Sequence, residues 1–174
     1  MNRTLKFLTA GLGLMLFLAA CTVTTRVDGN LHGRVRFETP VRADSVITHF
    51  RPTRGHGAVY NVGEDISFVL RSTQAGYVTL SYLDSSGRVA VFARNIRVSP
   101  TRNVISGPDP SHVFTVAEPR GFMQIRASWT PDRTNEAAIV YRGSSGPGGW
   151  NSALSVDITG QNVYDAVQTY IEVR

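Results

Sequence analysis

Short segments in which apolar and polar residues alternate recur along the chain, and this pattern limits the fold more than any other feature of the sequence. Alternation with a period of two places the apolar side chains on one face of a β-strand and the polar ones on the other. The segments with this pattern are residues 34–38, 46–50, 66–71, 78–82, 123–129, 153–158 and 167–173. Shorter strands are predicted at residues 103–106 and 112–116.

Turn signals between these segments indicate a sandwich or a barrel. Residues 84–87, Asp-Ser-Ser-Gly, have the composition of a tight turn, so residues 77–92 are predicted to form a hairpin. The 16 Gly and eight Pro in 174 residues favour turns over long helices. Helical signals are few: residues 161–165 fit one turn, residues 135–141 fit a helix or a buried strand, and residues 143–149 are predicted to be a loop. Phe68, Leu80 and Ile125 are predicted core residues.

The first residues have the pattern of a bacterial export signal. A short stretch with Arg3 and Lys6 precedes an apolar run over residues 7–20. This run is shorter than the roughly 20 apolar residues that a membrane-spanning helix needs. It ends in Leu-Ala-Ala followed by Cys21, which resembles the lipobox of bacterial lipoproteins. In that motif the cysteine thiol is acylated, and the cysteine becomes the first residue after cleavage. An ordinary secretory signal with a chance cysteine is the alternative.

Cys21 is the only cysteine, so acylation would remove an otherwise reactive exported thiol. The next residue is Thr22 rather than Asp. By similarity to lipoprotein sorting in envelopes with two membranes, this favours the outer membrane over retention in the inner one. The predicted organisation is a signal peptide over residues 1–20, a lipidated N-terminus and tether over residues 21–30, and a β-sandwich domain over residues 31–174.

Charge gives little functional information. The formal net charge is +5, and Lys6 is the only lysine, so every other cation is an arginine. Arginine suits recognition of phosphate or carboxylate groups, whereas biased composition explains the same count without a function. The arginines are scattered rather than clustered, which argues against a nucleic-acid partner, as does export.

Several motifs occur in an order that resembles the bacterial family catalogued as domain of unknown function 4384. They are Tyr-x-x-Gly-Glu at residues 60–64, Gly-Tyr-hydrophobic at residues 76–78, an Asp-x-x-Gly turn at residues 84–87, an Asn at position 95 and an apolar strand at residues 121–129. The resemblance covers roughly residues 45–130. It implies an immunoglobulin-like antiparallel β-sandwich in an exported or envelope-linked protein. The family carries no established catalytic activity, so the resemblance leaves the chemistry open. Tyr60 and Tyr77 are predicted to pack at the edge of the core, with a binding role as the alternative.

No catalytic constellation is evident, so we predict a protein that is not an enzyme and has no cofactor. The chain has no Gly-x-Ser-x-Gly elbow and no His-Glu-x-x-His motif. No two of its histidines have the spacing that places both imidazoles on one metal ion. His49 and His56 flank a loop and form a weak alternative metal site.

Three functions remain open. The first is a structural or protein-interaction module tethered to the outer membrane within a larger assembly, such as a surface layer, a porin or a secretion complex. The second is a binding module for cell-wall glycan or another envelope polymer, and the third is a small histidine-based metal-binding protein. The predicted partner contact is Trp150 with Gly148 and Gly149, because tryptophan often dominates binding energy. The alternative is that Trp150 packs under its own loop.

The lipidation hypothesis predicts the behaviour of the Cys21→Ser variant. Without the thiol, no acyl chain can be attached, and the variant should remain an uncleaved precursor or become soluble. Metabolic labelling with an alkyne fatty acid, followed by membrane fractionation, measures both effects. Normal processing and membrane retention of the variant would rule out the lipoprotein interpretation.

Overall fold

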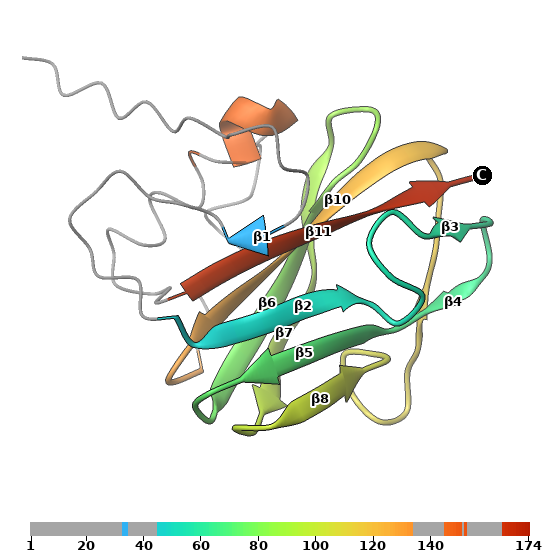
Figure 1. Cartoon of the computed structure of the whole chain (residues 1–174). Coiled ribbons are helices and arrows are strands. Elements are labelled where there is room, and N and C mark those ends of the chain that lie inside the picture. Colours follow the sequence, from blue (N-terminus) through green and yellow to red (C-terminus); the bar gives the residue numbers. More distant parts are fainter. Residues whose placement is uncertain (1–32, 35–44, 134–144, 151, 153–164) are drawn as a thin grey trace, which may run out of the picture.

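Strands dominate the architecture, as the alternating pattern predicts. The computed structural model describes residues 33–34, 45–133, 145–150, 152 and 165–174. Among these residues, strands account for 57% and helix for 6%. The strands form three sheets arranged as a sandwich-like fold, which confirms the predicted all-β class (Figure 1).

The largest sheet has the strand order β1-β11-β10-β6-β7. Its strands are β1 (Gly33–Arg34), β6 (Gly76–Leu83), β7 (Val89–Val98), β10 (Gly121–Thr130) and β11 (Asp165–Val173). These neighbours pair in antiparallel fashion, whereas β3 (Val59–Tyr60) pairs in parallel with the end of β11. The C-terminal strand therefore contacts segments from the beginning, the middle and the end of the domain.

Two smaller sheets complete the fold. One has the order β2-β5-β8, made of β2 (Ile47–Pro52), β5 (Phe68–Ser72) and β8 (Arg102–Ile105). The other pairs β4 (Asp65–Ile66) with β9 (Phe114–Thr115). In Figure 1 the β2-β5-β8 sheet lies in front of β6 and β7, and one hydrophobic cluster joins the facing sides of the sheets.

The core consists of the residues that the alternation selects. Phe68, Leu80 and Ile125 are exposed by 1%, 0% and 2%, respectively, which confirms all three as core residues. The predicted hairpin is also present as β6 and β7. Its turn is held by the Asp84 carboxylate, which accepts hydrogen bonds from the backbone N–H groups of Ser86 and Arg88 at 2.9 and 3.0 Å. Gly87 has a positive φ of 83°, a conformation that glycine adopts without a steric penalty.

Strand β2 departs from strict alternation. The pattern predicts Val46, Thr48 and Phe50 on the core side of the strand. In the structure Ile47 is buried, with 1% of its surface exposed, and Thr48 is exposed. The cause is an irregular register with β5 between Ile47 and His49. An extra residue in one strand reverses the faces of the residues on either side of it.

The predicted strand over residues 66–71 is two strands. Ile66 ends β4 and pairs with β9, whereas Phe68 begins β5 and pairs with β2 and β8. Both side chains remain in the core because they keep the period of two. A single alternating segment thus serves two sheets, and this change of partner cannot be read from the alternation.

The glycine-rich segment is not the loop that composition predicts. Residues 146–150 are helical, as is residue 152, and Pro147 lies in the first turn of this helix, where its missing N–H costs nothing. Asp165, placed by the sequence in a helical turn, belongs to β11 instead. The predictions for residues 35–38, 135–141, 153–158 and 161–164 fall outside the described residues. None of the described helical segments is long and apolar enough to span a membrane.

The Leu80→Ala variant tests this core. Leu80 is fully buried between the sheets, so truncation should lower the free energy of unfolding by roughly 2–5 kcal/mol through lost burial and a cavity. Chemical denaturation followed by circular dichroism measures the change. The matched control is Val104→Thr in β8, where 54% exposure should limit the change to about 0.5 kcal/mol. Equal effects of the two substitutions would contradict the described register.

Candidate functional site

An apolar pocket opens at the end of the sandwich where β10 begins and β11 ends. Its volume is about 360 Å³, and Met123 of β10 and Ile171 of β11 both line it. Other strands contribute Ile66, Phe68, Tyr82, Phe92 and Phe114. The pocket therefore draws its wall from the large sheet, from the β2-β5-β8 sheet and from the β4-β9 pair, and it exists only where all three meet.

Aromatic rings form much of the pocket wall. The rings of Phe92 and Phe114 meet edge to face, with centroids 5.1 Å apart and planes at 79°. The ring of Phe68 lies 6.2 Å from Phe114, and that of Tyr82 lies 6.0 Å from Phe92. These separations are within the range that favours aromatic pairs. Phe92 and Tyr82 are only partly buried, so an apolar group that enters the pocket can contact their rings.

The mouth of the pocket combines exposed apolar and charged residues. Val113 precedes β9 and is 60% exposed, which is high for a valine in a β domain. His112 and Glu118 also line the mouth. The Nδ1 atom of His112 lies 2.8 Å from the Asp109 carboxylate, and this hydrogen bond lowers the pKa of Asp109. The Glu118 carboxylate lies 3.3 Å from the Nε atom of Arg120.

The Tyr-x-x-Gly-Glu motif forms the turn that fixes one side of this mouth. The N–H of Gly63 donates to the carbonyl of Val116 at 2.8 Å, and the N–H of Val116 donates to the carbonyl of Glu64 at 2.9 Å. Gly63 has a φ of 89°, a conformation that residues with a side chain resist. Because Val116 lines the pocket, the turn holds the segment after β9 in place.

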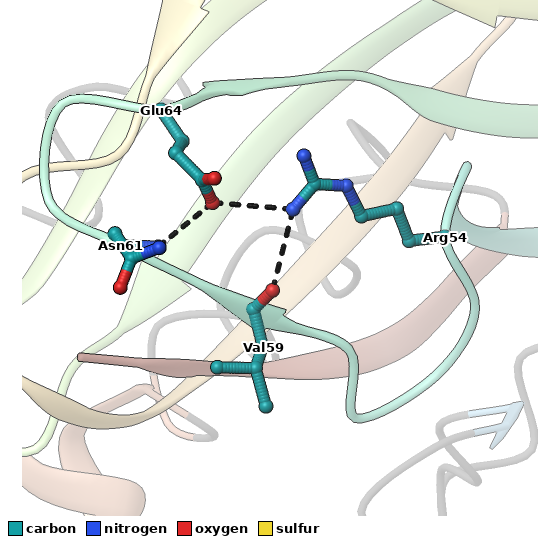
Figure 2. Close-up of polar contacts among 4 residues, drawn as sticks. All are labelled: Arg54, Val59, Asn61 and Glu64. Atoms are coloured by element: carbon teal, nitrogen blue, oxygen red, sulfur yellow. Dashed lines mark hydrogen bonds and ion pairs between the residues drawn. The ribbon is translucent and has the colours of Figure 1, made fainter.

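The turn is itself closed by charge-assisted contacts (Figure 2). The Glu64 carboxylate accepts a hydrogen bond from the backbone N–H of Asn61 at 2.8 Å and lies 3.1 Å from Nη1 of Arg54. The same Arg54 atom donates to the carbonyl of Val59 at 3.4 Å. The hydrogen bond from Asn61, and then Arg54, lower the pKa of Glu64, so its carboxylate is ionised at neutral pH. The glutamate of the motif therefore has a structural role.

The tyrosines of the motifs pack rather than face a ligand. Tyr60 is 1% exposed and belongs to the core, and the Arg54 guanidinium lies 4.5 Å from its ring centroid. Tyr77 is partly buried, with the Arg133 guanidinium 5.5 Å from its ring. The position of Tyr60 matches the predicted packing, whereas Tyr77 is not part of the described hydrophobic cluster.

Trp150, the predicted partner contact, is buried. It is 1% exposed, its Nε1 donates to the Ser81 hydroxyl at 3.2 Å, and the Arg126 guanidinium lies 3.7 Å from its ring centroid. Ser81 is in β6 and Arg126 is in β10, so the tryptophan covers the face of the large sheet opposite the core. Gly148 is exposed and Gly149 is partly buried. Trp150 therefore packs within the protein, and the hypothesis that it contacts a partner is wrong for the buried side chain.

The two candidate metal ligands have separate protein partners. His49 accepts a hydrogen bond on Nε2 from Nε of Arg51 at 3.0 Å. Its burial, and then the nearby Arg51 and Arg71, lower the pKa of His49, which fits a neutral imidazole. Nδ1 of His56 lies 2.7 Å from the Thr169 hydroxyl. In the part of the chain that the structure describes, no three His, Cys, Asp or Glu residues are grouped to hold a metal ion. Cys21 lies outside the described residues.

Sequence reasoning missed the pocket, although it identified several of its residues as strand residues. Met123 keeps the same period of two as the core residues Ile125 and Ala127, so alternation cannot tell a pocket wall from a core. One signal was available. Val113 and Phe114 are consecutive apolar residues beside a loop rich in proline and polar residues, and one of two neighbours on a strand must point away from the core.

Fold and site together define an all-β sandwich-like domain with an aromatic-lined pocket. A model of the family described as "Domain of unknown function (DUF4384)" matches residues 59–133. The resemblance inferred from the motifs is thus confirmed for this segment, which contains the turn at residues 60–64 and the strands from β3 to β10. No curated protein and no solved structure matches the chain.

The Trp150→Ala variant separates packing from partner contact. Loss of a buried indole and of its contact with Arg126 should lower the free energy of unfolding by about 3–5 kcal/mol. Phe122→Ala is the matched control, because Phe122 is 58% exposed and its loss should change stability by about 0.5 kcal/mol or less. Thermal and chemical unfolding measure both. An unchanged free energy of unfolding in Trp150→Ala would contradict the packing role and favour partner contact instead.

Proposed function

We propose that this protein is an envelope lipoprotein, anchored in the outer membrane through acylated Cys21, whose β-sandwich domain is a protein-interaction module. It would be an accessory subunit of a larger cell-surface assembly, such as a surface layer, a porin or a secretion complex. The proposal includes no catalytic step and no cofactor. The observation that carries it is the aromatic pocket, which offers an apolar group of a partner a preformed site.

The position of the pocket along the strands supports this role. Strand β1, which follows the proposed tether, pairs with Val167 and Gln168 near the start of β11. Ile171, which lines the pocket, lies near the end of the same strand. The described strand that follows the proposed tether is thus paired near one end of β11, whereas the pocket lies near the other end. Anchoring in a membrane raises the effective concentration of any partner there, so a small interface suffices.

Binding of cell-wall glycan is the alternative function. Phe122 is 58% exposed, and its ring lies 6.2 Å from that of Tyr170. Exposed aromatic rings are the usual stacking partners of sugars, which is the observation in favour of this alternative. The two ring planes are inclined by 50°, so the pair does not offer a flat platform. We therefore place protein interaction first.

Affinity isolation from crosslinked envelope tests the proposed function. The tagged full-length chain should recover a defined set of envelope proteins after gentle solubilisation. The Cys21→Ser chain should recover much less of the same set, because it no longer meets its partners at the membrane. Recovery of no protein above an untagged control, together with sedimentation of the Cys21→Ser chain with purified cell-wall glycan, would favour the alternative instead.

A further inference from the structure

Three arginines that are far apart in the sequence meet on the outer face of the β2-β5-β8 sheet. Arg71 of β5 lies directly opposite His49 of β2 on one side and Arg102 of β8 on the other. Arg51 shares the face of His49, because Phe50 between them points into the core. Arg51, Arg71 and Arg102 together form a basic patch. Figure 1 shows this face of the sheet toward the viewer, with no described strand or helix in front of it.

No described carboxylate pairs with the basic patch. Arg71 and Arg102 are exposed, and none of the ion pairs among the described residues involves them or Arg51. The Arg51 guanidinium donates to Nε2 of His49 at 3.0 Å and to two backbone carbonyls, which carry no charge. Burial of His49, and then the charges of Arg51 and Arg71, lower the pKa of the imidazole, which fits its role as a neutral acceptor. The positive charge of the face is therefore not balanced by described groups of the protein.

This arrangement does not stabilise the fold. Like charges directly opposite one another on neighbouring strands are destabilising, and Arg71 and Arg102 form such a pair. An anion from outside the protein would remove the repulsion. Phosphate suits the patch in particular, because the planar guanidinium of arginine can donate two parallel hydrogen bonds to it.

An exposed apolar side chain lies on the same face. Val104 of β8 is opposite Val69 of β5, which is opposite Arg51. Val104 is 54% exposed, whereas Val69 is 4% exposed without belonging to the described core clusters. On surfaces that lie on anionic membranes, cations attract the headgroups and apolar side chains enter the boundary between headgroups and acyl chains. A soluble anionic polymer offers nothing apolar for Val104 to contact, so this combination favours a membrane.

The patch begins near the end of β11 at which the strand that follows the proposed tether is paired. Strand β1 pairs with residues near the start of β11. The carboxylate of Asp165, the first residue of β11, accepts a hydrogen bond from the backbone N–H of Ile47 at 2.6 Å. The first residues of β2 therefore lie at the same end, and His49 follows two residues later. A lipid on Cys21 would limit the distance between this end of the domain and the membrane.

We propose that the outer face of the β2-β5-β8 sheet is a membrane-contact surface, on which the basic patch binds phosphate groups of anionic lipid headgroups and Val104 enters the interface. This inference goes beyond the proposed function and rests on it only for the lipid that brings the domain to the bilayer. A lipid anchor alone leaves the domain free to turn, whereas the anchor and the patch together would fix its orientation on the membrane.

Fluorescence quenching in vesicles tests the proposal with the acylated full-length chain. An environment-sensitive label is attached to Val104→Cys, since acylation blocks the thiol of Cys21. The control label is on Phe122→Cys, because Phe122 is 58% exposed and alternates with core residues of β10, which places it on the outer face of the opposite sheet. In vesicles of equimolar phosphatidylcholine and phosphatidylglycerol, a quencher at the headgroups should quench the label at position 104 more than the label at position 122. In vesicles of phosphatidylcholine alone, the two labels should be quenched equally.

Neutral variants of the patch identify the groups responsible. Arg71→Gln and Arg102→Gln should each lower the ratio of docked to free domain about fivefold. Arg88→Gln is the matched control and should leave the ratio unchanged, because Arg88 is exposed beside the β6-β7 turn and belongs to none of the described ion pairs. Thermal unfolding should show no loss of stability in the two patch variants, since each removes a like-charge repulsion.

The outcomes separate this inference from the proposed function. Quenching at position 104 that depends neither on anionic lipid nor on Arg71 and Arg102 would overturn the membrane contact and leave the lipoprotein proposal intact. Arginine-dependent sedimentation with an anionic cell-wall polymer, without preferential quenching at position 104, would also overturn it. If the chain is not acylated in cells, the proposed anchor fails. Co-sedimentation of the soluble chain with the same anionic vesicles should then still depend on Arg71 and Arg102.

Discussion

The pairing of the C-terminal strand β11 is the constraint on which the rest of the structure depends. Strand β11 lies between β1 and β10 and also pairs with β3, so it joins both ends of the described domain. Its side chains Val167 and Ile171 enter the core that the other strands build. The family segment ends at residue 133, before β11 begins. The folded unit is therefore larger than the segment that matches the family, and its large sheet is incomplete without the last residues of the chain.

The turn at residues 60–64 links the family motif to the pocket. Gly63 and Glu64 bond to the backbone of Val116, and the Glu64 carboxylate closes the turn onto Asn61 and Arg54. In this fold the motif residues hold the mouth of the pocket, and the residues that would contact a ligand are aromatic rings from other strands. The residues that position the mouth of the pocket and the residues that would contact a ligand thus come from different parts of the chain.

Trp150 shows why a sequence pattern can name an important residue and give it the wrong role. A tryptophan beside glycines has the composition of an exposed contact, but here a short helix folds it onto Ser81 and Arg126. The outer face of the large sheet is covered around Arg126 as a result, and Arg126 is only 1% exposed. The stacked indole supports the guanidinium that lies under it. The face of the sheet that alternation marks as polar is buried there only because a segment distant in the sequence packs on it.

The sequence by itself determined the all-β class, most strand positions, the hairpin turn at Asp84 and the core residues Phe68, Leu80 and Ile125. Each of these follows from local periodicity or turn chemistry, which act over a few residues. Only the tertiary structure decided the change of sheet after Ile66, the irregularity in β2, the burial of Trp150 and the pocket at Phe92 and Phe114. Each of those depends on which distant segments meet, and a period of two says which side chains share a face but not what that face packs against.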